Sequence, residues 1–225
     1  MRASMCRGRV GMHVVGTLFI MKLLIATRNP HKLEEIREIF DLPGLDIVSA
    51  LDYPEIPDVV EDGETLEANA VKKAVTLALA TGLHALADDT GLEVDALHGA
   101  PGVYSARYAG EHADYAANNR KLLAALNETD NRNAQFRCVI ALAEPDGRAQ
   151  YVEGVCRGAI ARAPRGENGF GYDPLFVPEG HERTFAELAS AEKHRLSHRG
   201  RALTEARRAW SERLAPEPEK PNPAP

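Results

Sequence analysis

The stretch from Leu83 to Leu92 constrains the fold of this chain more than any other, because two charged residues directly follow an apolar segment. An apolar run ending at Ala87 leads into Asp88 and Asp89, and a Thr-Gly pair follows. This order predicts a buried strand that ends in a turn at the rim of a sheet. Adjacent strand residues point to opposite faces, so the two aspartates cannot share one role unless the strand ends there. One could hold the turn while the other faces a ligand.

Residues 88 to 91 are also typical of an ordinary turn, because Asp accepts local backbone hydrogen bonds and Gly adopts positive φ. The functional interpretation is favoured by a general property of open α/β sheets, which bind ligands where strands end in acidic residues and glycine. It requires that the rest of the chain supply an anion site and a specificity pocket.

Composition limits the class of protein. With 225 residues, 44% hydrophobic and 27% charged, the chain is long enough for one large domain or two lobes around a real core. A formal net charge of -6 argues against a protein that binds nucleic acid through an overall positive charge. An anionic ligand would instead need local Lys and Arg, or a metal.

The cysteines Cys6, Cys138 and Cys156 have no metal-ligand spacing, and we interpret them as reduced and structural in a cytoplasmic protein. The apolar run from Val10 to Met21 superficially resembles a signal peptide. No small-residue cleavage site follows it, however, and it is too short to span a bilayer.

The two ends of the chain are expected to lie outside the domain. We expect the native start at Met21, with residues 1–20 as an N-terminal extension that is disordered or an artefact of the gene start. Residues 215–225 are rich in Pro, with Glu and Lys, and predict a disordered tail.

A short apolar strand, residues 23–26, runs directly into the polar stretch Thr27 to Lys32. Asn29 is a good N-cap and Pro30 a good first helical residue, which predicts a helix from about Pro30 to Phe40. A strand followed by a helix N-terminus binds anions through its amides and dipole, and Arg28 and Lys32 add charge. The alternative is a plainly capped surface helix with two solvated cations.

Further elements make the predicted sheet mixed. Residues 134–143 and 148–155 flank a Pro-Asp-Gly turn and predict an antiparallel hairpin. Asn69, inside a predicted helix that stops at Gly82, could reach toward the strand ends. Most carboxylates of the acidic loop 53–64, which includes Glu61, are expected to be solvated. The remaining predicted elements are a strand over 46–50 and helices over 65–81 and 114–126.

Phe170 stands between two glycines, on a backbone that can approach something flat, and this suits stacking on a nucleobase. The alternative is a hairpin-like turn with a core phenylalanine. Downstream, Lys193, His198 and Arg199 surround Ser197 at the start of a predicted helix. The helix dipole disfavours cations there, so their presence suggests a partner that offsets the cost.

Taken together, these stretches resemble the non-canonical purine nucleoside triphosphate pyrophosphatases, which act on inosine and xanthosine triphosphates and their deoxy forms. Thr90 stands where Ser is frequent in that family, and Arg28 where some members carry Gly. The matching pieces follow the family's order between residues 21 and 214: residues 26–32 with Glu35, 87–92, 99–108, 169–174, and Lys193 with 197–200.

The resemblance implies an elongated two-lobed α/β fold, in which a long mixed β-sheet is flanked by helices around a central nucleotide cleft. Residues 21–214 would form this nucleotide pyrophosphatase domain, usually as a homodimer in the cytoplasm, with no nucleic acid or membrane partner. The implied reaction hydrolyses ITP, dITP or XTP to the monophosphate and pyrophosphate, with Mg²⁺ as cofactor, and removes deaminated purines from the nucleotide pool.

The resemblance also implies residue roles. Asp89 would be the proton acceptor or a metal ligand, Glu61 a second metal carboxylate and Asp88 a support. Phe170 would stack on the base, while His198 and Arg199 would read its edge. Substrate contacts are implied for Thr27, Arg28, Asn29, Pro30, His31, Lys32, Thr90, Phe170, Gly171, Tyr172, Asp173, Lys193, His198 and Arg199.

Two other hypotheses stay open from the sequence. One is a pyrophosphatase for modified pyrimidine nucleotides on a similar scaffold. The other is a non-catalytic nucleotide-binding module, against which the paired acids argue.

Overall fold

The computed structural model describes residues 20–110 and 114–215, apart from the side chain of His31. The expected N-terminal extension and C-terminal tail therefore lie, except for Ile20 and Ala215, outside the described residues. Across the two described ranges, no helix combines the length and apolar character needed to cross a membrane.

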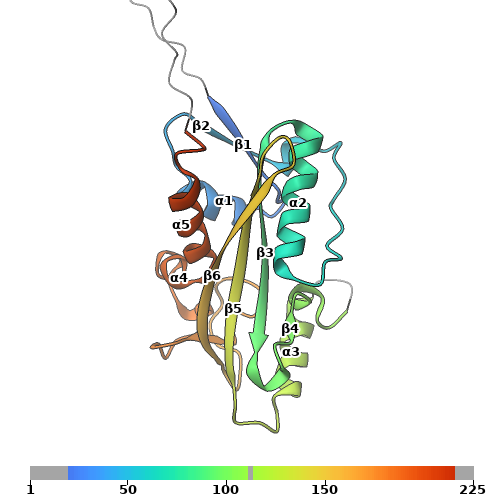
Figure 1. The fold of residues 1–225 in the computed structure, drawn as a ribbon. Helices are drawn as coiled ribbons and strands as arrows, with labels where there is room; N and C mark the ends of the chain where they lie inside the picture. The colour runs from blue at the N-terminus through green and yellow to red at the C-terminus, as the bar shows by residue number, and fades with distance from the viewer. Residues whose placement is uncertain (1–19, 111–113, 216–225) are drawn as a thin grey trace, which may run out of the picture.

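Within the described residues, the strands form one seven-stranded mixed sheet in the order β2-β1-β3-β5-β6-β7, with β4 paired to β3 (Figure 1). Strands β2, β1 and β3 run parallel to one another, and the remaining pairs are antiparallel, which confirms the predicted mixed sheet and hairpin. The strands are β1 (Met21–Ile25), β2 (Leu45–Ser49), β3 (His84–Val94), β4 (Pro101–Gly102), β5 (Asn133–Ala143), β6 (Ala149–Ile160) and β7 (Phe176–Pro178).

The helices form where the sequence predicted them. Thr65 caps α2 by accepting a hydrogen bond from the Ala68 amide, and Asp114 caps α3 in the same way through the Ala117 amide. Each cap satisfies an amide that has no partner within the helix. The helices are α1 (Pro30–Ile39), α2 (Leu66–Thr81), α3 (Tyr115–Ala125), α4 (Ser190–Leu196) and α5 (His198–Trp210).

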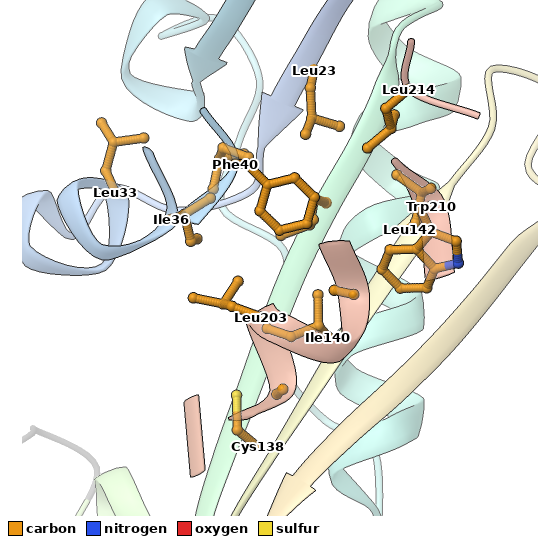
Figure 2. Packing of buried hydrophobic residues seen from close by; sticks show 14 residues of the cluster. Leu23, Leu33, Ile36, Phe40, Cys138, Ile140, Leu142, Leu203, Trp210 and Leu214 are labelled. Carbon is orange, nitrogen blue, oxygen red and sulfur yellow. The ribbon is translucent and has the colours of Figure 1, made fainter. Parts of the chain in front are cut away.

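Helices cover both faces of the sheet, and alternate residues of β3 enter different cores. Leu86 belongs to the cluster under α1 and α5, which includes Phe40 and Trp210 (Figure 2). Its neighbours Ala85 and Ala87 belong to the cluster under α2. Because side chains alternate along a strand, the next two residues continue the same pattern. Asp88 therefore follows Leu86 toward α1 and α5, and Asp89 follows Ala87 toward α2.

The predicted turn after Asp89 is wrong. Strand β3 continues through Thr90 and Gly91 as far as Val94, because β5 pairs with it from residue 85 to residue 94. Gly91 is not part of a turn but allows β4 to pack closely against β3. A Cβ at this position would lie 2.6 Å from the main-chain oxygen of Gly102 in β4.

An open edge of β3 replaces the predicted strand end. Strand β1 pairs with β3 only as far as Leu86, and β4 pairs with it only at Leu92 and Glu93. Among the described strands, none occupies this edge between those two pairings, over residues 87–91 of β3. Side chains from both faces can therefore reach the same space beside the edge.

Candidate active site

The two adjacent aspartates lie on opposite faces of β3. On the α1 and α5 side, Asp88 is buried, and its Oδ2 lies 2.8 Å from Lys32 Nζ and 3.5 Å from Arg199 Nε. On the α2 side, Asp89 accepts a hydrogen bond of 3.1 Å from Asn69 Nδ2, which confirms that Asn69 reaches the sheet. Both carboxylates line one cavity because β3 has an open edge at this point.

The two carboxyl groups differ in proton affinity. Burial alone would raise the pKa of Asp88, but the surrounding cations, Lys32 foremost, lower it below its usual range and keep the group ionised. Burial raises the pKa of Asp89 against the opposing charge of Lys73, and Glu61 adds to the rise. Asp89 is therefore the stronger base, which is the property that a proton acceptor needs.

Lys73 of α2 lies among these carboxylates, and no sequence pattern described above predicted it. Its buried Nζ donates a 2.5 Å hydrogen bond to the main-chain oxygen of Asp88, and lies 3.1 Å from Glu61 Oε1 and 4.0 Å from Asp89 Oδ1. Burial would lower its pKa, but the three acidic neighbours raise it, so the ammonium stays charged. The missed signal was a lysine one helical turn after Asn69, on the buried stripe of α2, because lysine is rarely buried unless paired.

The junction between β1 and α1 has the geometry of an anion site. Thr27 is buried, and its Oγ1 accepts a 3.1 Å hydrogen bond from the main-chain amide of Asn29. The first amides of a helix lack intrahelical partners and attract negative charge. Thr27, Asn29 and Lys32 line the cavity, whereas the exposed Pro30 is not part of its lining.

Arg28 also lines the cavity, but its guanidinium is engaged with the loop opposite. It forms an ion pair of 2.7 Å with Asp58 and donates a 2.7 Å hydrogen bond to the main-chain oxygen of Ile56. Arg28 therefore connects the anion junction to loop 53–65, which carries Glu61. The main chain of His31 lies in α1, and its side chain lies outside the described part of the structure.

The loop that carries Phe170 is fixed by Asp173. Asp173 Oδ2 accepts hydrogen bonds from the Phe170 amide at 2.8 Å and from Lys193 Nζ at 2.7 Å. Lys193 Nζ also lies 5.2 Å from the centroid of the Phe170 ring. The adjacent Tyr172 is buried and donates a 2.9 Å hydrogen bond to the main-chain oxygen of Ser105. Phe170 itself is half-buried and lines the cavity, so it is not the core phenylalanine of the alternative interpretation.

His198 and Arg199 are the first residues of α5, and both are buried. Arg199 Nη1 lies 2.8 Å from Glu35 Oε2, and Glu35 together with Asp88 offsets the cost of a cation at a helix start. The His198 ring stacks on Phe136 at 4.5 Å, and its Nδ1 has no hydrogen-bond partner among the described residues. Burial lowers the pKa of His198 well below the usual value, so the imidazole is neutral.

Most of these groups surround one cavity of about 560 Å³. Its lining includes residues of the junction after β1, α1, α2, β3, the loop 53–65, the Phe170 loop and the start of α5, which are far apart in the chain. The predicted residues that line it are Thr27, Arg28, Asn29, Lys32, Glu61, Asp89, Thr90, Phe170, Gly171, Tyr172, Asp173, Lys193, His198 and Arg199; the unpredicted ones include Tyr53, Lys73, Ser105 and Tyr115.

The donor atoms suit a hard divalent cation that is shared with a bound phosphate. Glu61 and Asp89 both lie near the Lys73 ammonium, so this point already stabilises positive charge. The Thr90 hydroxyl is buried without a hydrogen-bond partner among the described residues, but strand alternation places it on the Asp88 side of β3, away from Glu61 and Asp89. Within the described ranges, no group of three or more His, Cys, Asp or Glu side chains gathers as a metal site. Mg²⁺ commonly uses one or two protein carboxylates together with substrate phosphates and water, which this set allows.

The fold and the cavity define an α/β protein with an anion site beside a strand edge and an aromatic and basic pocket nearby. The chain belongs to the Ham1 family, whose sequence pattern it matches over residues 23–209. A dITP/XTP pyrophosphatase of Desulforamulus reducens is 54% identical over 188 residues, which cover 83% of this chain and 94% of that protein. The dITP/XTP pyrophosphatase of Streptomyces avermitilis is 52% identical over 188 residues, covering 82% and 94%.

Solved structures show the same similarity. The HAM1 protein from Coxiella burnetii has a TM-score of 0.81 and 44% sequence identity, and the match covers 86% of this chain and 100% of that chain. The Ham1 protein of Staphylococcus aureus has a TM-score of 0.79 and 40% identity, covering 85% and 99%. The mixed α/β fold is therefore that of the Ham1 family.

Proposed function

We propose that this protein hydrolyses non-canonical purine nucleoside triphosphates, namely ITP, dITP and XTP, to the monophosphate and pyrophosphate. The observation that carries the proposal is that one cavity joins an anion site, a pair of carboxylates around a lysine and an aromatic ring with basic neighbours. Membership of the Ham1 family, with relatives named dITP/XTP pyrophosphatases, supports the same activity. Removal of deaminated purines from the nucleotide pool is the role that follows.

The phosphates bind at the junction between β1 and α1 in this proposal. Thr27, Asn29 and the start of α1 supply donors, and Lys32 supplies charge. Glu61 and Asp89 would hold Mg²⁺. When bound, such a cation neutralises phosphate charge and so favours attack by water.

Asp89 accepts the proton of the attacking water or holds the cation, and its environment supports either role. Its raised pKa makes it a better base than Asp88. Lys73 offsets the negative charge that gathers between Glu61, Asp89 and the phosphates. Asp88 stays ionised and holds Lys32 and Arg199 in place.

Phe170 stacks on the base, and Arg199 donates a hydrogen bond to its 6-oxo group. Arg199 Cζ lies 5.6 Å from the centroid of the Phe170 ring, which places a donor beside the stacking surface. Adenine carries an amino group at this position, which would leave the buried donor unpaired. A site that hydrogen-bonds one polar group of its substrate can discriminate against an analogue that lacks this group by roughly 10⁴-fold. Neutral His198, whose Nδ1 has no hydrogen-bond partner in the described part of the chain, adds a second polar contact.

We further propose that residues 21–214 form this catalytic domain as an elongated two-lobed unit with the nucleotide in a central cleft. Lys193 contacts Asp173 and lies beside Phe170, which supports a substrate contact near the base. A homodimer in the cytoplasm is the assembly and location that we propose.

The test compares wild type with Asp89→Asn on inosine triphosphate in excess Mg²⁺, measured as pyrophosphate release. Asn keeps the size of the side chain but removes both the basic oxygen and the negative charge. We expect turnover to fall by at least about 10²-fold with nucleotide binding largely kept. Unchanged turnover would remove Asp89 from the mechanism.

A substrate panel in the same assay separates the remaining alternatives. Wild type should release pyrophosphate faster from inosine and xanthosine triphosphates than from methylated pyrimidine triphosphates. Faster release from the pyrimidines would reassign the substrate class. Binding without turnover on every nucleotide would identify a non-catalytic binding module.

A further inference from the structure

Tyr115, the first residue of α3, is an exposed aromatic residue at the cavity. The residue is 45% exposed, yet it contributes to the cavity lining. The buried positions of the same helix are Asn118 and Leu122, further from its start. The Tyr115 hydroxyl makes no hydrogen bond to any described residue. A large amphipathic ring at this position therefore contributes little to the core, and its contact with the cavity needs another explanation.

The Tyr115 ring faces the predicted base-stacking residue. Its centroid lies 6.2 Å from that of Phe170, with the two planes tilted by 38°. The two aromatic surfaces therefore come from different parts of the chain, one from α3 and one from the Phe170 loop.

A second contact shows that α3 is fitted to this loop. Asn119 Nδ2 donates a 3.0 Å hydrogen bond to the main-chain oxygen of Gly171. Residues four apart lie on the same side of a helix, so Tyr115 and Asn119 approach the loop together. One contacts the ring of Phe170 and the other fixes the next residue. The position of Tyr115 is thus set by the contact between α3 and the Phe170 loop.

We propose that Tyr115 is a second aromatic contact for the nucleobase, so that the base binds against both Phe170 and Tyr115. This inference rests on the proposed function. Aromatic side chains stack on any base through its π face, and tyrosine loses little conformational entropy in doing so. The contact would strengthen binding of the nucleoside part and leave the phosphate part unaffected. It would therefore act on KM more than on kcat, because it is made equally in the ground and transition states.

The experiment compares Tyr115→Ala and Tyr115→Phe with wild type on inosine triphosphate. Tyr151→Ala is the matched control, because Tyr151 is similarly exposed, at 53%, on strand β6 and is not part of the cavity lining. We expect Tyr115→Ala to raise KM by about tenfold, within the range measured for single base-stacking contacts, with kcat changed by less than about twofold. Tyr115→Phe and Tyr151→Ala should stay close to wild type.

Inorganic tripolyphosphate separates a base contact from a general distortion, since it carries phosphates without a base. Its inhibition constant should be the same for wild type and Tyr115→Ala. An unchanged KM for inosine triphosphate in Tyr115→Ala would overturn the inference, as would a parallel loss of tripolyphosphate inhibition. Failure of wild type to hydrolyse inosine triphosphate would instead overturn the proposed function, and this inference with it.

Discussion

One peptide bond separates two carboxylates with different chemistry at Asp88 and Asp89. Strand alternation points the first toward Lys32 and Arg199, which keep it ionised, and the second toward Lys73 and Glu61, where burial raises the pKa of Asp89 against the charge of Lys73. The sequence alone showed that the two could not share a role. It could not show which cation each would meet, because those cations come from other helices.

His198 makes stability depend on pH at the scale of a single residue. An unfolded histidine has a pKa near 6.5, and burial lowers the pKa of His198 well below this in the folded protein. As pH falls below about 6.5, the unfolded state binds a proton that the folded state does not, so the free energy of unfolding decreases. One such proton contributes up to about 1.4 kcal/mol per pH unit.

We therefore expect His198→Gln to lose less stability than wild type between about pH 7.5 and about pH 5.5, by roughly 1 kcal/mol. Urea unfolding at several pH values measures the difference. Parallel pH curves for the two proteins would show that His198 takes no part in the acid sensitivity.

Among the elements, the packing of α5 on β6 sets the position of the basic pocket. A Cβ on Gly154 would lie 2.3 Å from the Ala202 amide nitrogen and 2.3 Å from the main-chain oxygen of His198. The first turn of α5 therefore rests directly on the backbone of β6. Because Arg199 lies in that turn, the same contact fixes its distance from Phe170.

Gly154→Ala should push the start of α5 away from the sheet. Overpacking of this kind typically costs about 1–3 kcal/mol of stability. We expect a lower midpoint in thermal unfolding and a higher KM for inosine triphosphate, because Arg199 moves with the helix. Gln150→Ala, at an exposed position of the same strand, is the control and should change neither quantity. A wild-type KM in Gly154→Ala would argue against this positioning role.

Local sequence patterns predicted the elements well where local forces decide them. The helices predicted over 65–81 and 114–126 begin where Thr65 and Asp114 cap α2 and α3, and the predicted hairpin is that of β5 and β6. The turn at Thr90 failed because pairing with β5, almost fifty residues later in the chain, overrides turn chemistry. Lys73 and Tyr115 were missed because their roles depend on neighbours brought together by the tertiary fold.

At the scale of the whole molecule, the open edge of β3 explains how distant motifs reach one site. The parallel strands end where the β1 to α1 junction begins, and β5 continues along the other side of β3. The cavity beside this edge is therefore reached from both faces of the sheet. The order of the motifs in the sequence could predict which residues form the site. The distances between these residues depend on this interruption of the sheet.

Phosphorus NMR of the products from inosine triphosphate tests the central claim most directly. If water attacks between the α and β phosphates in this cavity, wild type with Mg²⁺ will produce inosine monophosphate and pyrophosphate in equal amounts. Inosine diphosphate should not accumulate at any stage. Release of orthophosphate together with inosine diphosphate would place the attack at the terminal phosphate and contradict the account.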